Sequence, residues 1–486
     1  MALPAKKITV APAVLEPLLY EQVAEKIERL IETEVLRAGD RVPSVRQMSG
    51  EQRVSVSTVF QAYFLLENKG LIEARPQSGF YVRRPLQALP PETVQRSMPA
   101  GKATTVEVGD LVAEFYASAR NPKLVPLGTA SASLALLPVK RLNRALHRAT
   151  KNSAAVMDYA MPAGSEVLRR QIARRAMTWG GLLSADDVLI TNGCLDAINL
   201  CLRAVAKPGD TIAVESPVYY GILQAIESLG MKALEVSTYP QQGVCIEELE
   251  HLLKKHPVKA CLFITNFSNP QGSLMPDEKK KYLVEMLAGR GIPLIEDDVY
   301  GDLAFDAARP KAAKAFDKEG LVLLCSSFSK TLAPGYRVGW VAAGRFAAQV
   351  ERLKFMTTVT TAVLPQLAIA EVLESGGYDR HLRGLRHAFA SQVQLATEAV
   401  CKYFPAGTKV SRPKGGFVLW VELPKKVRSL ELYRKALAEK ISIAPGVVFS
   451  AQRKYENFIR LSCGSQWSEK TERAMQTLGK LAAEQF

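Results

Sequence analysis

Apolar residues near the N-terminus recur every three or four positions, which is the period of an amphipathic helix. One helix is expected over residues 20–36. The apolar residues expected on its inner face are Val23, Ile27, Leu30 and Ile31. A second, short helix is expected to open after Ser44, whose hydroxyl is a suitable N-cap.

A third helix is expected to begin near Ser55 or Ser57 and to end at Gly70, because glycine commonly follows the last residue of a helix. The residues that would face inward from it are Val59, Tyr63 and Leu66. Beyond it, residues 71–74 and 79–82 alternate between apolar and polar side chains, which predicts a two-stranded hairpin.

Helices followed by such a hairpin form a winged helix-turn-helix, in which one helix enters the major groove of DNA. Hydroxyls at the start of that helix can bond phosphates or base edges, and arginines can reach the DNA backbone. The candidate DNA-binding residues are Arg46, Arg53, Ser55, Ser57, Thr58, Arg75 and Arg83. The spacing alone is equally consistent with a small protein-interaction domain.

Three stretches of this segment resemble the GntR-type winged helix: LYEQVAEKIERLI, GDRVPSVRQM and VSVSTVFQAYFLLENKGLIEARPQSGFYV. The resemblance extends along the whole of the segment, and the domain is assigned to residues 12–84. It favours DNA binding over protein interaction, and it implies a double-stranded operator as the partner.

Residues 85–107 contain four prolines and show weak periodicity, which predicts a linker. From residue 108 to residue 486, helical patterns alternate with short apolar runs. The runs over residues 188–191, 211–214, 260–265, 293–296 and 322–325 are expected to be buried strands of a largely parallel sheet, so the fold class is α/β. Ligands bind such sheets at the carboxyl ends of the strands.

Lys330 lies just beyond the run over residues 322–325, in the sequence Ser327-Phe328-Ser329-Lys330. A lysine at a strand end can form a Schiff base with an aldehyde cofactor. Ser327 and Arg337 could bind a phosphate beside it. A single motif of this kind is more often a solvated lysine, so the other strand ends decide the interpretation.

Each of the other strand ends carries a suitable group. Gly193 opens a helix whose backbone amides can hold a phosphate, and Tyr219 could stack on a flat ring. Asn269 supplies an amide that can bond a phenolic oxygen. Asp297 or Asp298 could keep a pyridine nitrogen protonated, and spacing alone does not decide between them.

In this order the motifs resemble fold-type I, class I aminotransferases that depend on pyridoxal phosphate. The resemblance covers residues 108–486 and implies a mostly parallel sheet with helices on both faces and a smaller C-terminal α+β subdomain. It implies Lys330 as the catalytic lysine that binds the cofactor, and Asp297 as the partner of the pyridine nitrogen.

The resemblance also implies roles for the remaining residues. Tyr300 and Asn269 would meet the ring oxygen, and Tyr219 would stack on the ring. The phosphate would be held by Gly193, Cys194, Leu195, Ser327 and Arg337. Tyr159 would reach the phosphate from the other subunit, and Arg460 would grip the α-carboxylate of a substrate.

The fusion of the two domains resembles the MocR subgroup of GntR regulators, especially members of the YdcR type. ARPQSGFYV and LIEDDVYGDL are two of the stretches that carry this resemblance. It implies a head-to-tail homodimer that regulates transcription and senses pyridoxal phosphate, or an amine or amino-acid effector. Two alternatives stay open: an active aminotransferase that carries a DNA-binding domain, and a regulator whose cofactor site is vestigial.

Composition changes this picture little. The net charge is +15, but residues 1–84 hold 12 Lys and Arg against 10 Asp and Glu, so charge does not locate the DNA-binding domain. The seven cysteines form no CxxC pair, which is typical of reduced thiols and indicates neither a metal site nor a disulfide framework. No signal peptide and no membrane span are recognisable, so a cytoplasmic protein is expected.

Overall fold

The structure of the chain is a computed structural model, which divides into a smaller unit up to Gln87 and a larger unit from Ala88. The described residues are 18–68, 70–75, 78–83, 89–119, 121–151, 156–306 and 308–485. Among these residues, no helix has both the length and the apolar content needed to span a bilayer. Nor does this part of the chain bring three or more His, Cys, Asp or Glu side chains together as a metal site would require.

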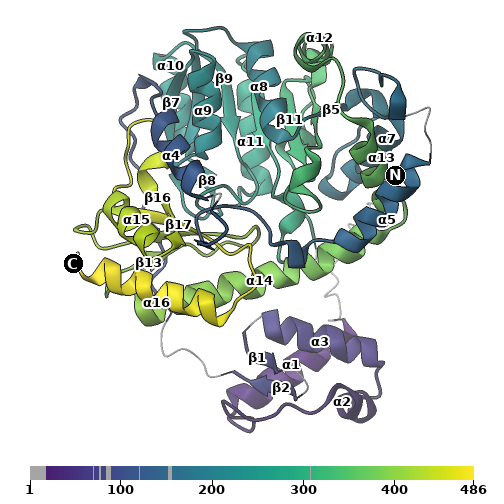
Figure 1. The fold of residues 1–486 in the computed structure, drawn as a ribbon, viewed down its shortest axis with the longest axis vertical. Helices are drawn as coiled ribbons and strands as arrows, with labels where there is room; N and C mark the ends of the chain where they lie inside the picture. Colours follow the sequence, from purple (N-terminus) through teal and green to yellow (C-terminus); the bar gives the residue numbers. More distant parts are fainter. Residues whose placement is uncertain are drawn as a thin grey trace, which may run out of the picture. The chain divides into compact units, whose positions relative to one another are not determined.

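The described residues of the smaller unit form three helices and a hairpin (Figure 1). Its elements are α1 (Leu19–Glu32), α2 (Val45–Gln52), α3 (Val56–Asn68), β1 (Ile72–Arg75) and β2 (Gly79–Val82). The two strands are antiparallel, with Ile72 opposite Val82. This order confirms the elements that the apolar pattern predicts.

The core of the smaller unit is built from one face of each helix. Ile27 of α1 and Val59 and Leu66 of α3 are completely buried. The hydroxyl of Tyr63 donates a 2.6 Å hydrogen bond to the carbonyl of Pro43, which ties α3 to the segment before α2. The Ser44 side chain accepts a bond from the amide of Gln47 and so caps α2 as expected.

The expectation of a helix over residues 20–36 is wrong at its C-terminal end, because α1 ends at Glu32. Glu34 has a φ of 57°, and the amide of Leu36 donates to the carbonyl of Leu30. This turn reverses the chain and satisfies a carbonyl of the last helical turn. Leu30, expected on the inner face, is 36% exposed, and Ala24 is buried in its place.

The larger unit is built around a nine-stranded sheet in the order β3-β7-β6-β9-β10-β11-β12-β5, with β8 paired to β7. Its strands are β3 (Ala103–Thr105), β5 (Leu189–Thr191), β6 (Thr211–Ser216), β7 (Lys232–Tyr239), β8 (Gly243–Val244), β9 (Val258–Phe263), β10 (Leu294–Asp297), β11 (Val322–Ser327) and β12 (Gly339–Ala342). The pairs from β7 through β6, β9 and β10 to β11 are all parallel. The five apolar runs are therefore strands of one largely parallel sheet, as expected, and β12 is an antiparallel strand that the pattern did not predict.

Helices cover both faces of this sheet, as the alternation of side chains along β6 demonstrates. Ile212 and Val214 belong to one apolar cluster, while Ala213 between them belongs to another. The first cluster includes residues of α8 (Cys194–Val205) and α9 (Tyr220–Ser228), and the second includes residues of α10 (Ile246–Lys255) and α11 (Asp277–Ala288). The carboxyl ends of the parallel strands are therefore an edge between two helical layers.

The remaining elements complete the larger unit (Figure 1). The helices are α4 (Gly109–Ala119), α5 (Val139–Thr150), α7 (Glu166–Ala176), α12 (Ala347–Thr358), α13 (Val363–Glu374), α14 (Gly377–Tyr403), α15 (Ser429–Ala438) and α16 (Glu469–Ala483). The strands are β4 (Val125–Pro126), β13 (Lys409–Val410), β14 (Val418–Glu422), β15 (Ile441–Ser442), β16 (Ala444–Pro445) and β17 (Phe458–Ser462). A second sheet, in the order β13-β14-β17-β16, is the core of the smaller C-terminal α+β part.

The structure describes most of the segment expected as a linker. Residues 84–88 lie outside the described residues, whereas residues 89–107 lie against the larger unit. Thr104 pairs with Ala233 of β7, and Arg96 forms a 3.2 Å ion pair with Glu248. A proline-rich segment without a regular apolar pattern can still be ordered when a neighbouring strand and an ion pair hold it.

We predict that Leu66→Ala destabilises the smaller unit by about 2–5 kcal/mol, because a completely buried leucine leaves a cavity. Amide hydrogen exchange of α1 and α3 in the full chain should become faster, and exchange in the larger unit should not change. Leu30→Ala is the matched control, because Leu30 is already partly exposed. Equal effects of the two substitutions would contradict the core described above.

Candidate functional site

Three consecutive acidic residues mark the carboxyl end of β10. Glu296, Asp297 and Asp298 are all buried. Side chains alternate along a strand, so Glu296 and Asp298 lie on one face while Asp297 lies on the other. The two faces give these carboxylates different partners.

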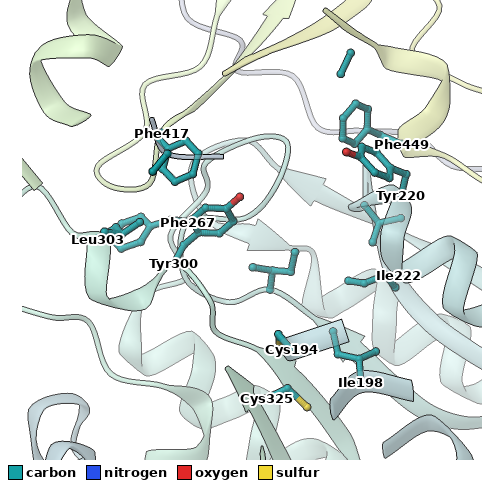
Figure 2. Packing of buried hydrophobic residues seen from close by; sticks show 14 of the residues in the cluster. Cys194, Ile198, Tyr220, Ile222, Phe267, Tyr300, Leu303, Cys325, Phe417 and Phe449 are labelled. Atoms are coloured by element: carbon teal, nitrogen blue, oxygen red, sulfur yellow. The ribbon is translucent and has the colours of Figure 1, made fainter. Parts of the chain in front are cut away.

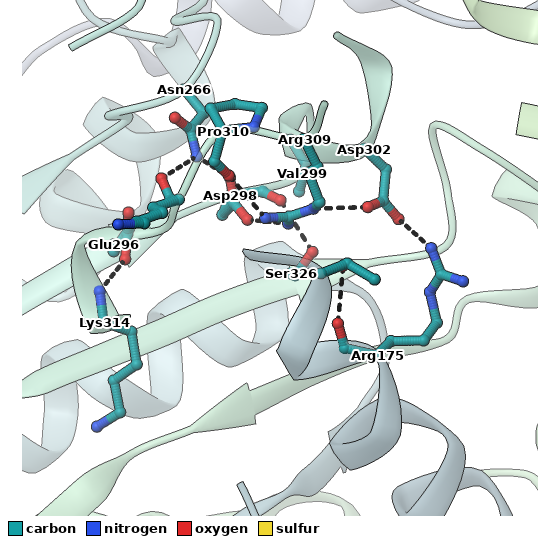
Figure 3. Close-up of polar contacts among 12 residues, drawn as sticks. Arg175, Asn266, Glu296, Asp298, Val299, Asp302, Arg309, Pro310, Lys314 and Ser326 are labelled. Atoms are coloured by element: carbon teal, nitrogen blue, oxygen red, sulfur yellow. Dashed lines mark hydrogen bonds and ion pairs between the residues drawn. The ribbon is translucent and has the colours of Figure 1, made fainter. Parts of the chain in front are cut away.

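On the first face, an arginine compensates the buried charge (Figure 3). Asp298 forms an ion pair with Arg309 and accepts a 2.8 Å hydrogen bond from the amide of Asn266. Arg309 also donates a 2.6 Å bond to Asp302, which lies 3.8 Å from Arg175. Burial raises the pKa of Asp302, but the charges of Arg309 and Arg175 outweigh it and hold the pKa at about 2.

On the opposite face, Asp297 has weaker partners. Its carboxylate accepts a 3.4 Å contact from the thiol of Cys194 and a 3.3 Å bond from the amide of Val299. Burial raises the pKa of Asp297 to about 6. Since Asp298 is engaged with Arg309, Asp297 is the carboxylate that can accept a proton or a hydrogen bond from a ligand.

Lys330 follows the end of β11 on the same side of the sheet as Asp297. Its Nζ donates a 2.7 Å hydrogen bond to the carbonyl of Ala130 and lies 5.8 Å from the centre of the Tyr300 ring. Burial, together with the charge of Arg460, lowers the pKa of Lys330 to about 8. A substantial fraction of this amine is therefore neutral near physiological pH and can act as a nucleophile.

Arg460 enters the same region from β17 and is completely buried. It donates a 3.1 Å bond to the side-chain oxygen of Asn269 and a second bond to the carbonyl of Gly128. Its guanidinium carbon lies 5.3 Å from the centre of the Phe449 ring, and its Nε has no partner among the described residues. A planar cation in an apolar wall is well suited to a carboxylate.

The hydroxyl of Tyr300 is buried and makes no hydrogen bond to any described residue. Figure 2 shows that the hydroxyls of Tyr300 and Tyr220 point toward one another, between Phe417 and Phe449. A buried donor without a partner is costly, so an additional oxygen atom at this place would satisfy it.

A second group of residues lies at the N-terminus of α8. Gly193 precedes the helix with a φ of 93°, and a Cβ at this position would clash with Nη2 of Arg337. Arg337 donates a 3.0 Å bond to the carbonyl of Asn192. The hydroxyl of Ser327 accepts a 3.3 Å bond from the amide of Ser329. The helix terminus and Arg337 together favour an anion.

Cys194 and Leu195 occupy the first turn of α8, where their backbone amides face the helix N-terminus. Cys194 is buried and Leu195 is partly exposed. Both residues therefore lie at the same helix terminus as Gly193, and their role in holding a phosphate stays a prediction.

Tyr219 lies directly before α9, with its ring centre 4.7 Å from that of Tyr220. Its hydroxyl is 3.3 Å from the hydroxyl of Tyr116 in α4. Sequence reasoning missed Tyr116, because nothing in the periodicity of its helix distinguishes it. It also missed Arg309, which belongs to a segment with no recognisable motif.

Tyr159 is the exception among the predicted residues of the larger unit. Its side chain is 82% exposed, and its amide bonds the carboxylate of Asp158. The structure does not gather it with Lys330 and Arg337. Its expected role toward a second subunit stays a prediction.

In the smaller unit, three hydroxyls meet at the start of α3. The Oγ of Ser55 lies 2.7 Å from that of Ser57 and 2.8 Å from the Oγ1 of Thr58, and it accepts a bond from the amide of Thr58. Ser55 therefore caps α3, while Ser57 remains exposed.

The arginines predicted to contact DNA have different placements. Arg46 in α2 and Arg53 just after it are exposed, whereas Arg83 is half-buried and its amide bonds the carbonyl of Leu71. The side chain of Arg75 lies outside the described residues.

Both units match known protein families. Residues 19–82 match the family described as bacterial regulatory proteins, gntR family, and residues 125–478 match aminotransferase class I and II. The HTH-type transcriptional regulator YdcR of Escherichia coli (strain K12) is 41% identical over 468 residues, which cover 96% of this chain and 99% of the relative. The HTH-type transcriptional regulator YjiR of the same organism is 38% identical, over 95% of this chain and 98% of the relative.

Aminotransferases that are similar to this chain cover a smaller share of it. A 2-aminoadipate transaminase of Thermus thermophilus is 31% identical over 71% of this chain and 86% of that enzyme. Among solved structures, the α-aminoadipate aminotransferase LysN of Thermus thermophilus, complexed with N-(5'-phosphopyridoxyl)-L-leucine, has a TM-score of 0.71. That structure is 28% identical to this chain and covers 77% of it, and the match extends over 94% of LysN.

We predict that Arg309→Met destabilises the larger unit by about 3–5 kcal/mol at neutral pH, because it leaves the buried carboxylate of Asp298 without its cation. Urea unfolding followed by tryptophan fluorescence measures this, since all four tryptophans belong to the larger unit. Arg345→Met is the control, because Arg345 is exposed and its ion pair with Glu319 is long.

The difference between Arg309→Met and the wild type should shrink as the pH falls. In the wild type, the pKa of Asp302 is depressed to about 2, so the stability that it contributes is lost as the pH falls through that value. The charge of Arg309 is the largest of the causes that lower the pKa of Asp302, so the variant loses this pH-dependent part of the stability. A difference that grows toward low pH would contradict this account.

Proposed function

The chain belongs to the gntR family of transcription regulators, of the MocR type with an aminotransferase class I and II domain, and on this premise we propose that pyridoxal phosphate or an amine controls its binding to DNA. The observation that carries the proposal is the placement of Lys330. Its amine is buried, has a lowered pKa, and lies on the same side of the sheet as Asp297.

The residues present fit pyridoxal phosphate. Lys330 would attach the aldehyde, Asp297 would accept the pyridine N–H, and the unpartnered hydroxyl of Tyr300 would bond the ring oxygen together with Asn269. Tyr219 would stack on the ring. The phosphate would be held by Gly193, Cys194, Leu195, Ser327 and Arg337. When bound, the cofactor supplies an electron sink for carbon acids and amines.

The residues of this chain prepare the site for a ligand. The buried Asp297 holds a proton at its carboxyl group up to a pH of about 6 in the free site, so it can share one proton with a basic ring nitrogen. Lys330 can release its own proton near a pH of about 8. Phe417 and Phe449 exclude water from the region into which Tyr300 points.

The expected effector is an amino acid or a related amine. Arg460 is a buried cation with aromatic neighbours, and its planar group matches the two oxygens of an α-carboxylate. Arg460 and Lys330 both bond the segment that contains Gly128 and Ala130, so one small molecule could meet both side chains.

The regulatory link requires that the ligand bind one arrangement of the protein better than another. We infer a head-to-tail homodimer, in which the exposed Tyr159 of one subunit would reach the phosphate site of the other. A dimer would also present two copies of α3 to paired half-sites on DNA.

A second candidate is a working aminotransferase. Lys330, Asp297 and Arg460 are all present, and the relatives of the larger unit include a 2-aminoadipate transaminase. Steady-state transamination with a panel of amino donors distinguishes the two. Sustained turnover together with DNA binding that ignores cofactor and amines would favour the enzyme.

We predict that the wild type reconstituted with pyridoxal phosphate has a visible absorption band that borohydride reduction removes. Lys330→Ala should lack this band. In the wild type the band should form faster as the pH rises toward about 8, because only the neutral amine of Lys330 adds to the aldehyde. Lys318→Ala, at an exposed lysine, should leave the band unchanged.

Lys330→Ala should also remove most of the response of DNA binding to the cofactor or amino acids. The probe is a duplex selected from a random-sequence library by the full-length protein, and its affinity is titrated with and without ligand. A change of about 5- to 150-fold is expected for the wild type, and DNA should alter ligand affinity by the same factor. The sensor proposal would be wrong if the wild type bound the duplex with the same affinity in the absence and in the presence of the cofactor and every amine of a broad panel.

We predict that amino acids perturb the absorption band more than simple alkylamines of similar size, because Arg460 binds the α-carboxylate. Arg460→Lys should reduce that preference by about tenfold or more, since an ammonium cannot form the two parallel bonds of a guanidinium. Equal responses of the wild type to both ligand classes would assign Arg460 a structural role only.

A further inference from the structure

The outer face of α3 carries large apolar side chains that the core does not use. Val56 is 47% exposed and Phe60 is 54% exposed, whereas Val59, Tyr63 and Leu66 on the inner face are fully buried. Residues four apart lie one above the other on a helix, so Val56 and Phe60 form one apolar strip in the N-terminal half of α3. An exposed phenylalanine in such a strip indicates a surface that binds something.

The polar neighbours of this strip are neutral. Ser57 and Gln61 are exposed beside Val56 and Phe60, and α3 contains no lysine or arginine. Arg53 and Arg46 are the two cations that precede α3 most closely in the sequence, and both are exposed. This arrangement separates two tasks, because the arginines can neutralise phosphates while the face of α3 meets uncharged groups.

The missing cations restrict what the helix can read. Guanine is recognised in the major groove mainly by arginine or lysine, while apolar side chains contact the methyl group of thymine and glutamine bonds the N6 and N7 of adenine. Val56 and Phe60 are suited to thymine methyl groups, and Gln61 is suited to adenine. Their position near the start of α3 is where a recognition helix touches base edges.

We propose that Val56 and Phe60 pack against thymine methyl groups in the major groove, and that Gln61 reads an adenine beside them. The half-site contacted by α3 then has a core of A·T pairs. The proposal rests on the DNA-binding function of the smaller unit and specifies which bases that unit recognises. Another occupant of the strip, a second copy of α3, is an outcome of the test below.

The experiment uses the full-length protein and a duplex that it selects from a random-sequence library. Each thymine of the selected duplex is replaced in turn by deoxyuridine, which removes only the methyl group. At one or two positions of each half-site the wild type should bind about fourfold more weakly, which is the effect of exposing one methyl group. These positions should be A·T pairs in every selected sequence.

Phe60→Ala should weaken binding to the thymine duplex by a similar or larger factor, and it should lose the sensitivity to deoxyuridine at one of these positions. Phe355→Ala is the matched control, because Phe355 is 53% exposed on α12 of the larger unit and should leave both quantities unchanged. Amide exchange in α1 and α3 checks that Phe60→Ala remains folded. If Phe60→Ala does not fold, the deoxyuridine measurements on the wild type still test the proposal.

Three results would overturn the proposal. The wild type could be indifferent to every deoxyuridine, Phe60→Ala could retain the full sensitivity, or Phe60→Ala could instead change the association state of the protein in sedimentation, which would make the strip a protein interface. Failure to select any duplex is a different result, because it removes the DNA-binding function itself.

Discussion

Burial of charge at the end of β10 is the constraint on which the larger unit depends. Three adjacent carboxylates are withdrawn from water there, and each must find a partner or a proton. The alternation of the strand assigns Asp298 to Arg309 and turns Asp297 toward Lys330. One strand therefore supplies a fixed ion pair on one face and a proton-binding group on the other.

This division separates stability from chemistry. A series of ion pairs joins β10 to α7 through Asp298, Arg309, Asp302 and Arg175. Its two carboxylates balance its two guanidinium groups. Asp297 is then free of a fixed cation, so its protonation can respond to a ligand. The same principle applies to Lys330, whose amine bonds a neutral backbone carbonyl, so that burial dominates its pKa.

The sequence predicts those parts of the molecule that local pattern and strand ends determine. The five apolar runs are strands, and the groups that follow them, such as Lys330, Asn269 and Gly193, meet at one edge of the sheet because parallel strands end together. Arg309 and Tyr116 could not be found in this way, since neither belongs to a recognisable motif, and Tyr116 lies 103 residues before its partner Tyr219. The end of α1 was missed for another reason: Glu34 adopts a left-handed conformation that its residue type does not favour.

The segment around Gly128 and Ala130 connects the two cations of the site. The carbonyl of Ala130 accepts the bond from Lys330, and the carbonyl of Gly128 accepts a bond from Arg460. A cofactor aldehyde at Lys330 and the carboxylate of an amino acid at Arg460 would compete with both carbonyls, because each side chain would have a better partner there than in a neutral peptide oxygen. Such binding would release this segment from both side chains. A rearrangement that begins there has a source of free energy in the ligand itself, which is the condition for a change elsewhere in the protein.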